Sequence, residues 1–123
     1  MKKDDVTIET LIARCFQARD ITHFNHLTTD SFAIHSTLGT FYDDVIEAID
    51  KVIENYIGSF GEVRDLPEMD RKQPKDIIAY LQDEGDYIES NRDVLSNGSD
   101  NIAALLDDLA EVYTHTVYRL GLK

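Results

Sequence analysis

The sequence has little of several residue types that define particular classes of protein. Its 123 residues include one Cys, two Pro and no Trp. A single cysteine excludes an internal disulfide framework and a cysteine-based zinc site within one chain. No apolar run approaches the roughly 20 residues of a membrane-spanning helix. Lys and Arg number 12 against 24 Asp and Glu, a formal net charge of −12. Such a surface repels phosphate backbones, so nucleic-acid binding is not expected.

The chain does contain enough apolar side chains for a core. They make up 42% of the residues, and this length is typical of one domain, so we predict a single domain over residues 1–123. The stretch from Met1 to Asp5 lacks the apolar segment of a signal peptide, and we expect a cytoplasmic protein. An acidic surface attracts cations, which is compatible with metal handling and equally with solubility alone.

Apolar residues recur with the three- and four-residue spacing of helix faces in four blocks. The first block runs from Ile8 to about His26. The second is the most regular and predicts a helix of about 28 residues that ends at Gly58 and Gly61. Its apolar arc is wider than one seam of a small bundle needs, so we expect a homo-oligomer, a dimer or larger.

The second half of the chain continues the helical pattern. A segment over residues 62–73 has no helical periodicity and predicts a crossing loop, and Pro74 suits the first turn of a third helix. The turn-forming residues 96–100 precede a fourth helix that ends at Gly121. The layout predicts an all-α protein, an antiparallel four-helix bundle with one crossing connection.

Candidate metal ligands gather around the first helix–helix junction and along the second helix. They are His26, His35, Asp43, Asp50 and Glu54. The three carboxylates share a helix stripe with His35, and imidazoles with carboxylates form a ligand set for iron, manganese or zinc. The same spacing is typical of a solvated acidic face with a few surface histidines, and spacing alone leaves both interpretations open.

The segment from His26 to His35, followed by Asp50 and Glu54, resembles the signature of the Dps family, the ferritin-like mini-ferritins of starved cells. The resemblance covers about residues 8–61, and the second half agrees in its helical layout. It is greatest to small uncharacterised Dps-like proteins that phages encode. The resemblance implies a ferritin-like fold, an oligomer and iron as the metal.

In Dps proteins the iron site lies between two subunits. The resemblance therefore implies that His26 and His35 come from one chain, and Asp50 and Glu54 from its two-fold mate. The family has an Asp four residues after the second histidine, where this chain has Gly39. Asp43, one turn later, is the candidate substitute. The implied reaction is oxidation of Fe(II) by peroxide or dioxygen, and the missing carboxylate leaves enzymatic activity open.

Other features narrow the alternatives. The basic tail that binds DNA in some Dps proteins is reduced to Lys2 and Lys3, and no Glu-x-x-His pair of the standard di-iron bundle is present. Cys15 lies on the apolar face of the first helix and is predicted to be a buried core thiol. The second hypothesis is a non-enzymatic oligomeric helical protein with a degenerate metal site that acts in protein–protein interaction.

Overall fold

The computed structural model describes residues 6–122, and this part of the chain is all-α, as predicted. Its five helices are α1 (Ile8–Thr28), α2 (Phe32–Phe60), α3 (Ile77–Ser90), α4 (Arg92–Ser96) and α5 (Asp100–Leu120). Within the described part there is no strand, and no helix is both long and apolar enough to span a membrane. Lys2 and Lys3, on which the DNA-tail argument depends, lie outside the described residues.

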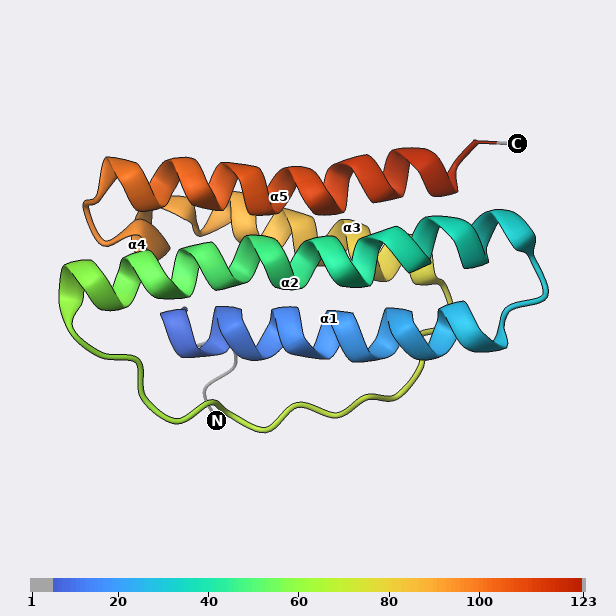
Figure 1. The fold of residues 1–123 in the computed structure, drawn as a ribbon, viewed down its shortest axis with the longest axis horizontal. Coiled ribbons are helices and arrows are strands. Elements are labelled where there is room, and N and C mark those ends of the chain that lie inside the picture. Colours follow the sequence, from blue (N-terminus) through green and yellow to red (C-terminus); the bar gives the residue numbers. More distant parts are fainter. Residues whose placement is uncertain (1–5, 123) are drawn as a thin grey trace.

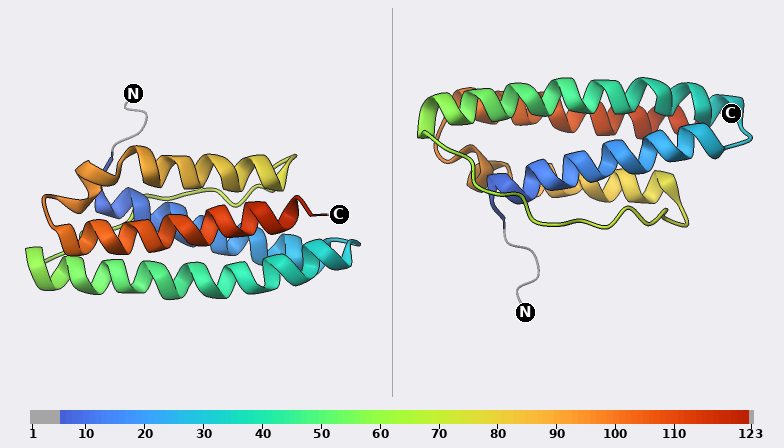
Figure 2. Two further views of the ribbon diagram at one scale, coloured as in Figure 1. Left: turned by 90° about the horizontal axis from the view of Figure 1, so that it is seen from above. Right: turned by 60° about the horizontal axis from the view of Figure 1, so that its bottom comes forward.

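The four long helices lie side by side (Figures 1 and 2). Helix α1 packs against α2 and α3, and α5 packs against the same two helices. The helices of each packed pair run antiparallel to each other, whereas α2 and α3 run in the same direction (Figure 1). The chain between α2 and α3 therefore has to return along the length of the molecule, as the crossing loop was predicted to do.

Each long helix begins beside a short polar side chain that accepts a hydrogen bond from the first turn. The caps are Thr7, Ser31, Asp76 and Ser99. Such caps satisfy backbone N–H groups that have no partner within the helix. At the other end of α2, Gly61 has φ +103°, a conformation that glycine adopts without steric cost. The predicted end of the second helix at Gly61 is therefore confirmed, whereas Gly58 lies inside the helix.

Two expectations for the second half were wrong. Helix α3 begins at Ile77 rather than at Pro74, because the Asp76 carboxylate accepts hydrogen bonds from two N–H groups of the first turn and fixes the start there. The helix also stops at Asn91, and the short α4 follows. Asn97 (φ +52°) and Gly98 (φ +83°) then make the predicted turn into α5.

The core lies between the four long helices. It includes Leu11, Cys15, Leu38, Phe41, Val45, Ile49, Leu81, Leu106, Leu109 and Tyr113, all at most 1% exposed. The buried position predicted for Cys15 is confirmed. Helix α3 approaches α5 closely at Gly85, where a Cβ would lie 3.2 Å from the Cβ of Tyr113. Glycine at this position therefore sets the distance between the two helices.

An ion pair joins α1 to α3 at the edge of this core. The Arg14 guanidinium donates two hydrogen bonds of 3.0 Å to the Glu84 carboxylate, and it also lies 3.7 Å from the ring centroid of Tyr87. Both charged side chains are largely buried. The fork geometry fixes the relative position of the two helices as well as contributing energy.

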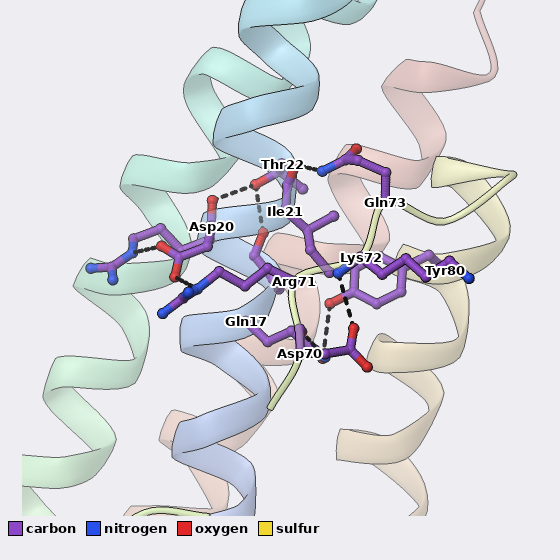
Figure 3. Close-up of polar contacts among 11 residues, drawn as sticks. Gln17, Asp20, Ile21, Thr22, Asp70, Arg71, Lys72, Gln73 and Tyr80 are labelled. Atoms are coloured by element: carbon purple, nitrogen blue, oxygen red, sulfur yellow. Dashed lines mark hydrogen bonds and ion pairs between the residues drawn. The ribbon is translucent and has the colours of Figure 1, made fainter. Parts of the chain in front are cut away.

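Side chains hold the crossing segment, residues 61–76, against α1 (Figure 3). The Gln17 amide donates to the Asp70 carbonyl at 2.8 Å, and the Arg71 guanidinium lies 2.9 Å from the Asp20 carboxylate. Gln73 donates to a main-chain carbonyl of α1 at 3.0 Å. A hollow of about 400 Å³ remains between this segment and α1. Residues 61–76 thus form an extended segment that side-chain hydrogen bonds fasten to α1 along one side of the molecule, and we call this segment the strap.

Candidate functional site

The junction between α1 and α2 brings two of the predicted ligands together. His26 lies near the end of α1, His35 lies in the first turn of α2, and only residues 29–31 separate the helices. The two imidazole rings are stacked, with centroids 3.9 Å apart and planes 14° from parallel. His26 is half-buried and His35 is exposed. A paired histidine site therefore exists within one chain.

Reciprocal hydrogen bonds fix the orientation of the two rings. His26 Nδ1 lies 2.6 Å from the His35 carbonyl oxygen, and His35 Nδ1 lies 2.8 Å from the His26 carbonyl oxygen. A carbonyl only accepts, so both Nδ1 atoms carry the hydrogen and donate it. In a neutral imidazole the lone pair is then on Nε2. Each ring consequently offers one nitrogen as a metal ligand.

Gly39 makes room for this arrangement. A Cβ built at position 39 would lie 3.0 Å from His26 Cε1 and 3.2 Å from His26 Nδ1, closer than an ordinary van der Waals contact. Sequence reasoning treated Gly39 only as the loss of a carboxylate. The structure shows that the His26 ring lies against the helix where that side chain would start. A side chain at this position would require the His26 ring to shift by a few tenths of an ångström.

Two further rings extend the cluster. His23 stacks on Tyr42 with centroids 4.4 Å apart, and Tyr42 meets His26 edge to face at 5.4 Å. The predictions from the sequence gave Tyr42 no place at the junction. The available signal was its position three residues after Gly39, on the helix face that receives the α1 histidines. Tyr42 is therefore a supporting residue that the pattern did not reveal.

The predicted carboxylates lie elsewhere along α2. Asp43, Asp50 and Glu54 are all exposed. Fifteen residues separate His35 from Asp50, about 22 Å along a helix. Within residues 6–122 no group of three or more His, Cys, Asp or Glu side chains is placed to hold one metal ion. One chain therefore brings the two imidazoles together and keeps the carboxylates apart from them.

The junction also exposes large apolar side chains. Phe24, Leu27 and Phe32 are 55%, 64% and 81% exposed. A hollow of about 440 Å³ beside the histidines is lined by Asp20, His23, Phe24, Leu27 and Arg71. Exposed aromatic and aliphatic groups that gather in one place are typical of contact surfaces.

Cys15, the one nucleophilic thiol of the chain, is not part of this site. It is fully buried, and the Tyr113 hydroxyl donates to its sulfur at 3.5 Å. Burial raises the pKa of the thiol from 9.0 to about 12. Since the thiolate is the reactive form, Cys15 stays protonated and inert at neutral pH.

The fold and the junction together define an all-α protein with a stacked pair of histidines where its first two helices meet. A family model matches residues 26–120, from the first histidine of this pair to the end of α5. The chain belongs to that family, which is described as a family of unknown function (DUF5856). No curated protein and no solved structure matches the chain.

Proposed function

We propose that the protein is a cytoplasmic ferritin-like four-helix bundle that binds a divalent metal ion, such as iron, at a site shared by two copies of the chain. His26 and His35 of one copy supply imidazoles, and Asp50 and Glu54 of the other supply carboxylates. The observation that carries the proposal is the histidine pair, whose Nδ1 atoms both donate to main-chain carbonyls and whose Nε2 atoms hold the lone pairs.

The course of the chain supports a ferritin-like bundle. Four long helices are antiparallel to their neighbours, and α2 and α3 run in the same direction with a long return segment between them. This arrangement requires one crossing connection in an otherwise up-and-down bundle, which is the ferritin-like connectivity.

The residues present fit a divalent ion only if two copies contribute. The Nδ1 donation to a carbonyl orients each imidazole and raises its basicity, as partners of metal-bound histidines commonly do. Asp50 and Glu54 are four residues apart, so both project from the same side of α2. Two neutral nitrogens and two carboxylates neutralise a divalent cation and are compatible with iron, manganese or zinc.

A two-fold axis determines which carboxylates reach the histidines. When two α2 helices lie antiparallel, His35 is centred between Asp50 and Glu54 of the second copy if the axis passes close to residues 43 and 44. Asp43 then lies at the axis, about 12 Å along the helix from the level of His35. The proposal therefore assigns the metal to four residues and not to Asp43.

Titration of Fe(II) under anaerobic conditions, or of Zn(II), tests the proposal. Wild type is expected to take up about one ion per chain, and His35→Ala and Glu54→Gln are each expected to lose at least tenfold in affinity. His115→Ala is the matched control, because His115 is an exposed histidine on α5. Equal, non-stoichiometric binding by wild type and His35→Ala would rule the site out.

The alternative is a non-enzymatic oligomeric protein that keeps the fold and acts through protein–protein contacts. The observation that favours it is the role of the histidines within the chain, where His26 fills the space at Gly39 and both rings bond the main chain. The metal content of the purified protein, measured by emission spectrometry, separates the two. Absence of any metal after purification without chelators supports the alternative.

A further inference from the structure

Helix α2 carries a second apolar seam beside its core seam, and the middle members of this second seam, Tyr42, Ile46 and Ile53, are half-buried against the core. Its members follow one another at intervals that fit one helix face, and they are Phe32, Tyr42, Ile46, Ile53, Ile57 and Phe60. Three of them are strongly exposed, Phe32 at 81%, Ile57 at 43% and Phe60 at 41%. The core seam of the same helix, from Leu38 to Val52, is fully buried. A helix inside one small bundle needs only the core seam.

We infer that this outer seam of α2 is the interface with a second copy of the chain, packed antiparallel along α2 about a two-fold axis. The inference deepens the proposed function and rests on it for the position of the axis, because it names the surface that joins the two copies. The contact itself consists of side chains and needs no metal ion.

One position of the axis satisfies two independent requirements. With the axis near residues 43 and 44, His35 is centred between the partner's Asp50 and the partner's Glu54. The same axis centres Phe32 between the partner's Ile53 and the partner's Ile57. The most exposed aromatic side chain of α2 therefore meets two isoleucines of the outer seam in the register that completes the histidine site. Nothing in the metal chemistry requires this coincidence.

The charge distribution along α2 also favours antiparallel pairing with a second copy. The helix contains five acidic residues and one Lys, a net charge of −4, and its first turn contains no acidic residue. The acidic residues lie between Asp43 and Glu54, in the middle and second half. Antiparallel pairing about residues 43 and 44 brings Asp50 and Glu54 towards the partner's helix N-terminus, whose dipole is positive, and leaves acid beside acid at the axis alone. Parallel pairing would instead place every acidic residue of the helix beside its own copy.

The outer seam is complementary to itself, which favours a second copy of the chain as the partner that covers it. The start of the seam presents a large exposed Phe, and the end presents isoleucines, so two copies related by a two-fold axis make the same contact twice. An isologous contact of this kind closes and leaves no seam for further growth. A partner of unrelated sequence would have to match both ends of the seam separately.

Light scattering in EDTA tests the seam without metal. Wild type is expected to have twice the mass of one chain. Phe32→Lys and Ile57→Glu are each expected to halve the mass, because each places a charge inside an apolar contact. Val94→Glu is the matched control and should remain a dimer, since Val94 is 63% exposed and belongs to α4, not to the seam residues of α2. Circular dichroism and the unfolding midpoint confirm that the variants fold.

A mixture of the two monomeric variants tests the register. In a mixed dimer one contact joins the introduced Lys to the introduced Glu, and the other contact is wild type. The mixture is therefore expected to recover the dimer mass. A monomeric wild type in EDTA, variants that remain dimers, or a mixture that stays monomeric would each overturn the inference.

The outcomes also separate this inference from the metal proposal. If the protein is a dimer in EDTA but takes up neither Fe(II) nor Zn(II), the apolar interface is supported and the metal proposal is wrong. If the protein is monomeric in EDTA and dimerises only when Zn(II) is added, the metal proposal is supported and the apolar interface is overturned.

Discussion

Gly39 and His26 share one small volume between α1 and α2. The His26 ring lies so close to the Gly39 backbone that a Cβ would be 3.0 Å from Cε1. At Gly58, also within α2, the same added carbon would meet nothing within 4 Å. The two glycines therefore offer a comparison in which the same substitution within one helix meets a close contact at position 39 and open space at position 58.

Substitution by Ala is expected to have different effects at these two positions. Gly58→Ala should raise the free energy of unfolding by about 0.5–1 kcal/mol, because Ala is the better helix former. Gly39→Ala should gain less or lose stability, because the His26 ring has to move. Urea denaturation measures both, and the NMR signals of the His26 ring should shift only in Gly39→Ala. Equal gains in the two variants would contradict this account of the junction.

Burial of Cys15 predicts a loss of stability in alkali. The folded thiol ionises near pH 12, whereas the unfolded thiol ionises near its ordinary value of 9.0. Above pH 9 the unfolded state binds fewer protons than the folded state, so stability falls as pH rises. The slope from this group is up to about 1.4 kcal/mol per pH unit.

The measurement compares the free energy of unfolding of wild type and Cys15→Ala between pH 9 and 10. This window precedes the buried tyrosines, whose ordinary pKa is 10.0. Wild type should lose stability more steeply than Cys15→Ala. Parallel slopes would show that the thiol does not titrate differently in the two states.

Residue patterns predicted the identity of the histidine pair but not its geometry. His26 and His35 were singled out by the resemblance to the Dps signature and by their place around the first helix–helix junction, where a short break forces the ends of two helices together. The hydrogen bonds from each Nδ1 to the main chain of the other helix, and the space that Gly39 leaves for the His26 ring, depend on how α1 packs against α2. Local residue spacing does not determine this packing, so the sequence pattern could not predict either feature.

At the scale of the elements, periodicity predicted the four long helices and both tight breaks, because each helix buries one continuous seam and begins at a side-chain cap. It missed α4 and set the start of the third helix too early. Asp76 and Pro74 both suit a helix start, and the hydrogen bonds that the Asp76 carboxylate accepts from the first turn place the start at Ile77. Apolar periodicity alone does not distinguish between these two starts.

The strap along α1 is expected to loosen when Gln73 is shortened. Gln73 donates to the Ile21 carbonyl at 3.0 Å and accepts from Asn25 at 3.3 Å. Gln73→Ala should lower the free energy of unfolding by about 1 kcal/mol. It should also speed tryptic cleavage after Arg71.

Glu68→Ala, an exposed position in the same segment, is the control for both measurements. Cleavage at wild-type rate in Gln73→Ala would show that the other contacts hold the strap without it.

At the scale of the whole molecule, the net charge of −12 opposes association of two copies. The proposed two-fold axis concentrates this repulsion where the two Asp43 side chains approach each other. Asp43→Asn should therefore lower the dissociation constant of the dimer in EDTA by about two- to fivefold, equivalent to the 0.5–1 kcal/mol typical of exposed charge pairs.

Dilution followed by light scattering measures that constant. Asp108→Asn, an exposed change on α5, reduces the net charge equally and serves as the control. If the two variants lower the dissociation constant equally, the repulsion depends on the net charge and not on the position of Asp43 at the axis. Metal uptake should be unchanged in Asp43→Asn, since the proposed ligands exclude this residue.

Each imidazole at the junction is bonded to the main chain of the opposite helix, so occupancy and local order are coupled there. A cation bound at Nε2 draws electron density from the ring and strengthens Nδ1–H as a donor. The strengthened bond closes on a carbonyl across the turn. On the metal proposal, ion uptake would then hold the ends of α1 and α2 together more firmly, and a firmer turn would in turn hold the ion more tightly. The turn would act as a small cooperative unit in which binding and rigidity reinforce each other.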